Sequence, residues 1–194
     1  MTIIPSTEHS FYHKNYNNKL KICIVSDSHD RSEPLAAAII EAHAAGAEAV
    51  IHCGDLIGAN TLRASLKVGL PMHVIHGNNL GDMVAIQKLM NKSEGKLVYH
   101  GMDATLELAG KKIFITHYPH YGHGMACTGD YDLVCCGHSH VSKVLKQANI
   151  KGGNTILVNP GSVAGMYAPS ITPAFTWVLG DLENMTFEIK TLLQ

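Results

Sequence analysis

The sequence lacks the features that mark several classes of protein. None of its apolar runs reaches the roughly 18 residues of a membrane-spanning helix, and its first residues lack the charged start and apolar stretch of a signal peptide. There are 15 basic and 16 acidic residues, so the formal net charge is −1, without the basic surplus that nucleic-acid binding uses. We therefore expect no membrane contact and no nucleic-acid partner.

Cysteine is also sparse, and its spacing is irregular. The five cysteines are an odd number without the spacing of a disulfide framework. Cys23, Cys53, Cys135 and Cys136 lie in short apolar runs, where a reduced thiol packs as a small hydrophobic side chain. Reduced thiols are typical of the cytoplasm, which is the compartment that we expect.

Histidine, in contrast, is abundant, with 13 in 194 residues. His9 and His13 fall in the polar stretch of residues 1–19, which we expect to be a flexible N-terminal extension. The whole chain is 46% hydrophobic and 16% charged, a composition typical of globular proteins. We expect residues 20–194 to form a single domain.

Five short apolar runs each end in residues with polar, cation-binding side chains. Such runs predict buried strands, and continuous apolar residues are typical of parallel strands. The residues that follow the runs are Asp27 and His29, Asp55, Asn78, His117, and His138 and His140. Because ligands of α/β sheets bind beyond the carboxyl ends of the strands, we expect these seven side chains to meet.

This set of two carboxylates, one amide and four imidazoles suits divalent ions such as manganese, iron, zinc or nickel. Without cysteine, a structural zinc site is disfavoured. Seven donors are too many for one tetrahedral ion but suit two ions that share a carboxylate. Two ions about 3.5–4 Å apart can stabilise the attacking and leaving oxygens of an in-line displacement. Each residue alone could equally belong to a turn or a strand end, but their joint order favours a metal site.

The first half of the sequence alternates strands with helices, and the second half is rich in strands. We predict helices over 33–45, 60–68 and 83–90, with Ser32 capping the first. We interpret residues 118–130, with three glycines, as a connection that either shapes substrate access or is mobile. Predicted strands cover 21–26, 48–53, 72–75, 96–100, 105–109, 112–116, 132–136, 142–146, 155–158, 174–179 and 186–192. This order predicts an α/β fold of two packed sheets with helices outside.

The motifs Asp27-x-His29, Gly54-Asp55, Gly77-Asn78, His117 and Gly137-His138-x-His140 together resemble the signature of the calcineurin-like metallophosphoesterases. The resemblance extends from residue 21 to the C-terminus. The chain length and the segment Asn159-Pro160-Gly161-Ser162 are similar to the small bacterial and archaeal phosphodiesterase branch. The resemblance implies a four-layered α/β/β/α sandwich of two mixed sheets flanked by helices.

The resemblance also implies two divalent metal ions, with manganese favoured and iron, zinc, nickel or magnesium as alternatives. By the family pattern, one ion would bind Asp27, His29, Asp55 and His140. The other would bind Asp55, Asn78, His117 and His138, so that Asp55 bridges the two. The implied activity is hydrolysis of a small phosphate diester by in-line attack of a metal-bound hydroxide.

The sequence departs from the family pattern after the motif asparagine. Many members carry histidine there, which helps to protonate the leaving group, whereas this chain has Asn79. A general acid typically contributes 10²–10⁴-fold, although the small branch often has Asn or Cys at this position. After His117 many small members read Gly-His, whereas this chain has Tyr118-Pro119-His120. Either His120 or His123 could replace that second histidine as phosphate contact or acid, or both could be solvated loop residues. The candidate catalytic residues are therefore Asn78, His117, Asn79 and His120.

Four questions remain open from the sequence. The fold also occurs as a non-catalytic scaffold, as in the retromer subunit that resembles these enzymes, and a nuclease would share the chemistry but need a basic groove. Ser162 could contact phosphate or simply belong to a turn at Pro160-Gly161. The sequence does not decide the oligomeric state, and a homo-oligomer is compatible with it.

Overall fold

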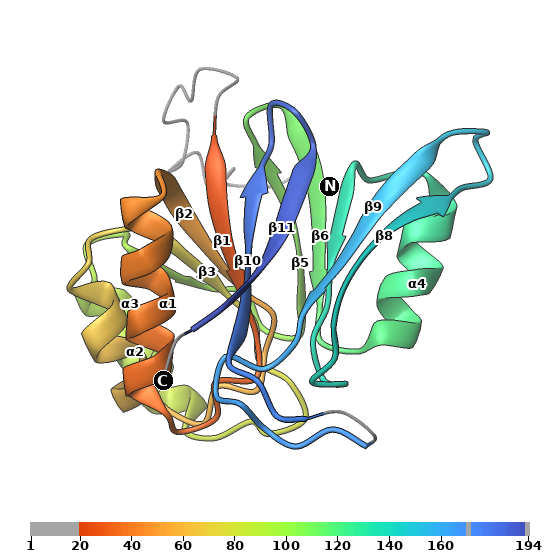
Figure 1. Ribbon diagram of the computed structural model, residues 1–194. Helices are drawn as coiled ribbons and strands as arrows, with labels where there is room; N and C mark the ends of the chain where they lie inside the picture. The colour runs from red at the N-terminus through yellow and green to blue at the C-terminus, as the bar shows by residue number, and fades with distance from the viewer. Residues whose placement is uncertain (1–19, 170–171, 193–194) are drawn as a thin grey trace, which may run out of the picture.

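A computed structural model describes residues 20–169 and 172–192, so the expected extension of residues 1–19 lies outside the described residues. Four helices and eleven strands form the described part of the chain (Figure 1). None of these helices is long and apolar enough to cross a membrane.

The first sheet has six strands in the order β11-β10-β1-β2-β3-β4. Four of them run parallel, namely β1 (Lys21–Val25), β2 (Ala47–His52), β3 (Met72–Val74) and β4 (Leu97–Tyr99). Two antiparallel strands complete it, β10 (Thr176–Asp181) and β11 (Thr186–Thr191). The predicted parallel pairing of the first two strands is thus confirmed.

The second sheet has five strands in the order β5-β6-β7-β9-β8. Its parallel centre consists of β6 (Lys111–Thr116), β7 (Leu133–Cys135) and β9 (Asn154–Pro160). The antiparallel edges are β5 (Asp103–Leu108) and β8 (Ser142–Ala148). Both sheets are therefore mixed.

The helices cover the two outer faces (Figure 1). The first sheet carries α1 (Ser32–Ala44), α2 (Ala59–Leu66) and α3 (Met83–Lys92), and the second carries α4 (Pro119–Thr128). One apolar core lies under the first three helices, a second between the sheets, and a third under α4. The expected four-layered α/β/β/α fold is confirmed.

Strand β1 shows why an unbroken apolar run is needed here. Cys23 and Val25 belong to the core under the helices, whereas Ile22 and Ile24 belong to the core between the sheets. Since successive side chains point to opposite faces, both faces must be apolar when both are covered. Burying one such aliphatic side chain contributes roughly 1.5–3 kcal/mol.

The four cysteines expected to pack as hydrophobic side chains are indeed buried and reduced. Burial raises the pKa of the Cys136 thiol to about 12, which keeps it protonated. Cys127, on α4, is the one cysteine of the described residues that is not fully buried.

Two local predictions were wrong. Ser32 is the first helical residue of α1, and the capping position is Arg31, without a side-chain cap hydrogen bond. Residues 119–128 form α4, where we expected a connection. Pro119 starts this helix with its φ already fixed, and Gly129 ends it in the left-handed conformation. Packing on the second sheet outweighs the helix penalty of Gly122 and Gly124, about 1 kcal/mol each.

Candidate metal centre

The structure brings all seven predicted donors together. They lie in loops that follow the carboxyl ends of β1, β2, β3, β6 and β7, and these loops gather at the lower end of the molecule in Figure 1. The donors thus come from both sheets, and the shortest links between them, from Asn78 to His138 and to His117, cross from one sheet to the other.

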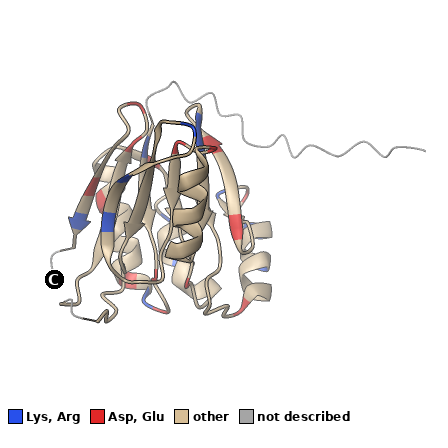
Figure 2. Ribbon diagram, turned by 90° about the vertical axis from the view of Figure 1, so that its right-hand side faces the viewer, with Lys and Arg blue, Asp and Glu red and all other residues tan. Residues whose placement is uncertain are grey.

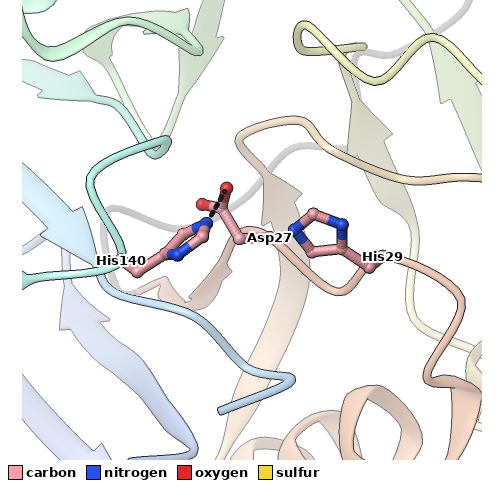
Figure 3. A group of neighbouring side chains, drawn as sticks. All are labelled: Asp27, His29 and His140. Carbon is pink, nitrogen blue, oxygen red and sulfur yellow. Dashed lines mark ion pairs between the residues drawn. The ribbon is translucent and has the colours of Figure 1, made fainter. Parts of the chain in front are cut away.

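Asp27 lies between His140 and His29 in the first group of donors. His140 Nε2 lies 3.3 Å from Asp27 Oδ1, and the ring of His29 lies on the opposite side of the carboxylate (Figure 3). The ligand atoms of these three residues all lie within 4.8 Å of one another. Their separation leaves room for a cation in contact with each.

Asp55 lies between this group and the second one. Its Oδ2 lies 3.9 Å from His29 Nε2, and its Oδ1 lies 3.3 Å from His117 Nε2. Asn78 Oδ1 completes the second group, at 3.1 Å from His117 Nε2 and 2.8 Å from His138 Nδ1. One carboxylate therefore faces both groups of donors.

Backbone contacts fix which nitrogen of two histidines is free. Nδ1 of His117 donates to Cys53 O at 2.8 Å, and Nδ1 of His140 donates to Tyr167 O at 2.7 Å. In a neutral ring the other nitrogen, Nε2, then carries a lone pair. Histidines that bind metals are usually held in this way by their second nitrogen.

The lone pairs of this cluster face one another, which requires positive charge between them. His117 Nε2 points at oxygens of Asp55, Asn78 and Asp27, the last at 4.0 Å. Asp27 Oδ1 and His29 Nε2 are buried without a hydrogen-bond partner. Buried polar atoms are rarely left unsatisfied, so either protons or cations must fill the space. The donor set fits divalent cations.

The electrostatics of Asp27 favour the ionised carboxylate. Burial opposes ionisation, but the nearby His140 ring and Ser26 hydroxyl, and the positive charge that His117 and His140 carry when protonated, outweigh it in the absence of metal, so the pKa of Asp27 lies below its usual value. The same contact with Asp27, partly offset by burial, raises the pKa of His140. An ionised, fully buried carboxylate is a strong cation ligand.

Backbone strain is concentrated at the same place. Of the eight non-glycine residues with positive φ among those the structure describes, five are predicted donors: Asp27, His29, Asp55, His138 and His140. Such conformations cost of order 1–3 kcal/mol each and persist at functional sites, where the surroundings enforce them. The strain turns the side chains of successive loops toward one point.

A comparison with models of protein families shows which family the chain belongs to. The model of the calcineurin-like phosphoesterase superfamily domain matches residues 20–185. The chain belongs to this family. It is 28% identical over 148 residues to phosphodiesterase MJ0936 of Methanocaldococcus jannaschii, over 75% of this chain and 86% of that protein.

Solved structures support the same placement among small archaeal and bacterial phosphodiesterases. A structure described as a novel archaeal phosphodiesterase superposes with a TM-score of 0.77 at 25% identity, over 89% of this chain and 100% of that one. Vps29 of Entamoeba histolytica, in complex with zinc, superposes with a TM-score of 0.58 at 15% identity, over 89% of this chain and 98% of that one. At that identity, the likeness to Vps29 shows the fold alone.

Asn79, where many calcineurin-like phosphoesterases carry histidine, binds the carboxylate of Asp55. Its backbone N–H donates to Asp55 Oδ1 at 2.9 Å, and its side-chain amide donates to Oδ2 at 2.6 Å. The side chain thus holds the carboxylate that faces both groups of donors. It has no titratable proton to give to a leaving group.

Tyr118 is a neighbour of the site that the motif did not single out. Its ring packs edge-on against His117 and His138, with centroids 5.4 Å and 5.2 Å apart. His120, exposed on the first turn of α4, lies beside the same ring, at 5.7 Å. His123 is one turn further along, near the thiol of Cys127. A tyrosine directly after the motif histidine is the only sequence signal for this contact.

Ser162 supports the site from behind. It is fully buried, and its hydroxyl donates to the backbone oxygen of Asp27 at 2.9 Å while accepting from Ala164 N and Met166 N. Of the two interpretations of Ser162, the turn is therefore the one that these hydrogen bonds support.

Proposed function

We propose that this protein is a dinuclear metal-dependent phosphodiesterase that hydrolyses small phosphate diesters by in-line displacement at phosphorus. The observation that carries the proposal is the cluster of mutually facing lone pairs around Asp27, Asp55 and His117, which calls for cations. Membership of the phosphoesterase family supports the reaction type, and the names of two relatives support a diester substrate.

The seven donors would hold the ions in two groups joined by Asp55. Asp27, His29 and His140 belong to the first, and Asn78, His117 and His138 to the second. Two divalent ions, when bound, would offset charge on the phosphate oxygens and lower the pKa of a water molecule toward neutrality. We favour manganese, because mixed carboxylate and imidazole donors suit borderline divalent ions.

The chain's own residues hold this arrangement in place before substrate arrives. The carbonyl groups of Cys53 and Tyr167 orient two imidazoles, and both hydrogen bonds of Asn79 orient Asp55. Groups held within a fraction of an ångström of their working positions need no reorganisation during the reaction. Asn79 is thus a positioning residue in this proposal.

Protonation of the leaving group is the weak step. Asn79 cannot supply a proton, and we propose His120 as the group that does, since it lies at the exposed rim beside Tyr118. Esters with good leaving groups, such as p-nitrophenol, need little protonation. We expect His120→Gln to slow alkyl esters by about 10²-fold and to change p-nitrophenyl esters much less.

Metal analysis combined with hydrolysis of bis-p-nitrophenyl phosphate tests the proposal. We expect two ions per chain after loading with manganese, and manganese-dependent turnover. Asp55→Ala should remove at least one ion and lower turnover by about a thousandfold or more. Asp103→Ala, at an exposed position on β5, is the control with the same change of side chain. Less than one ion per chain and no manganese-dependent turnover would overturn the proposal.

A non-catalytic scaffold is the second candidate. Structures of Vps29 superpose on the chain, and Leu80, Met83 and Val84, at 44%, 39% and 64% exposure, form an exposed apolar strip after Asn79. The same experiment separates the two, since a scaffold does not require turnover. The retained donor set favours the enzyme.

A further inference from the structure

A groove between α2 and α3 has cations as half of its lining residues and lies apart from the candidate metal centre. It is formed by the last turns of both helices and the turn that leads into β4, and its volume is about 480 Å³. The donor loops adjoin the opposite, amino-terminal ends of these helices. The cations that line the groove are Arg63, Lys67, Lys92 and Lys96.

These cations have no carboxylate partner within the described part of the chain. The lysine ion pairs found there join Lys151 to Asp130 and Lys190 to Glu188. All four groove cations are exposed, and Arg63 donates only to the neutral side-chain oxygen of Asn60. One acidic residue, Glu94, also lines the groove, which leaves a surplus of three positive charges.

The helix dipoles account for only part of this surplus. Cations near a helix C-terminus interact favourably with its partial negative charge, which is roughly half an elementary charge per helix. The ends of α2 and α3 together therefore offset about one charge. About two positive charges remain, in a protein whose formal net charge is −1. On the face of the molecule drawn in Figure 2, basic and acidic residues are instead interspersed.

The floor of the groove is apolar. Leu66 and Leu89 line it, and both are half-buried side chains that pack against the core under the helices. A ligand that fits this surface carries several negative charges for the rim and an apolar ring for the floor. The volume falls in the range of about 300–1,000 Å³ that is usual for small-molecule sites.

We propose that this groove binds a small organic polyphosphate of the nucleoside di- or triphosphate class, independently of the proposed hydrolase function. The phosphates would contact the four cations, of which arginine offers a planar pair of donors and lysine a compact charge. The base would lie on Leu66 and Leu89. A volume of about 480 Å³ is in the range of small-molecule sites, so we commit to a free nucleotide as the ligand.

Calorimetric titration of the full-length protein tests the proposal, after passage over a chelating resin to remove metal ions. ATP should bind more tightly than AMP, and adenosine should not bind measurably. The double variant Lys92→Glu/Lys96→Glu should weaken ATP binding at least about tenfold, because two attractive charges become repulsive. The matched variant Lys143→Glu/Lys146→Glu, on exposed positions of β8, should bind ATP as the unmodified protein does.

Several outcomes would overturn the proposal: equal ATP affinity in the groove variant and the unmodified protein, equal affinity for adenosine and ATP, or tighter binding of an acidic peptide than of ATP. Circular dichroism and the melting temperature verify that the groove variant is folded. If the groove variant is not folded, the double variant Arg63→Gln/Lys67→Gln repeats the test with the cations on the α2 side of the groove. The groove variant should keep full turnover of bis-p-nitrophenyl phosphate, so a failed groove proposal leaves the phosphodiesterase proposal untouched.

Discussion

Gly77 illustrates how closely single residues are fitted around the candidate metal centre. A Cβ atom added to it would overlap Asp55 Oδ1 and lie 2.7 Å from His117 Nε2. Gly137 is crowded in the same way by Ser26 and by Asp27, whose Oδ2 would lie 2.7 Å away. The glycines of the motif are therefore required by the close approach of the side chains beside them.

We expect Gly77→Ala to impair the metal centre. Asp55 must shift to admit the methyl group, so the affinity for manganese and the turnover should each fall at least about tenfold, and the free energy of unfolding should fall by about 1–3 kcal/mol. Metal titration and denaturant unfolding measure both effects. Gly58→Ala is the matched control, because nothing lies within 4 Å of its added Cβ. Equal losses in both variants would contradict the explanation.

A buried histidine, His73, gives a second prediction at the scale of single residues. Burial and the nearby imidazole of His100, 3.1 Å away, lower the pKa of His73 to about 4. In the unfolded chain its pKa is about 6.5. Below pH 6.5 the unfolded state therefore binds the proton first, and stability is lost as the pH falls from 6.5 toward 4.

We expect this one residue to cost the protein about 2 kcal/mol of stability between pH 7 and pH 5. His73→Gln keeps a hydrogen-bonding side chain but removes the titration. Urea unfolding of metal-free protein at both pH values should show a smaller loss in the variant by about that amount. The same loss in both proteins would mean that His73 is protonated in the folded state.

Among the helices, α4 is the one that the sequence pattern did not predict. Its two interior glycines differ in their surroundings. Gly124 has open space around an added Cβ, whereas a Cβ at Gly122 would lie 3.2 Å from Cys136 Cβ and 3.5 Å from Thr116 Cγ2. Gly124 therefore only lowers the stability of the helix, whereas Gly122 allows the helix to approach the sheet.

We predict opposite outcomes for the two alanine substitutions. Gly124→Ala should stabilise the protein by about 0.5–1 kcal/mol, because alanine loses less backbone entropy in a helix. Gly122→Ala should gain nothing or destabilise, since the helix must move away from Cys136 and Thr116. Thermal unfolding of the two variants measures the difference. A similar gain in both would show that α4 is not held against the sheet at Gly122.

At the scale of the whole molecule, the residues of the candidate metal centre come from both sheets. Asp27 and Asp55 follow strands of the first sheet, and His117 and His140 follow strands of the second. Ions bound to all four would hold the sheets together at this end. A ligand that binds only the folded state stabilises it in proportion to the logarithm of its concentration.

Metal removal should therefore lower stability. At manganese concentrations 100 times the dissociation constant, the loaded protein should be about 2.7 kcal/mol more stable than the metal-free one. Melting temperatures before and after treatment with a chelating resin measure this. Asp55→Ala should show little or no difference between the two conditions. A metal-independent melting temperature in the unmodified protein would argue against ions that span both sheets.

The prediction from sequence was strongest where the local pattern coincides with the global fold. Apolar runs followed by Asp27, His117 or His138 identified both the strands and the side chains that lie together, because parallel strands bring their carboxyl ends to one edge. The orientation of Asn79 toward Asp55 could not be predicted, because rotamers depend on neighbours from other loops. The helix over residues 119–128 was hidden because its stability comes from packing, which overrides the low helix propensity of glycine.

The sequence by itself determined the family, the layered fold and the choice of the seven candidate donors, because these follow from the order of short motifs and from hydrophobic periodicity. Only the tertiary structure decided which nitrogen of His117 and His140 is free, which residue holds Asp55, and that four distant cations line one groove. These properties depend on distances between segments far apart in the chain, and only folding sets those distances.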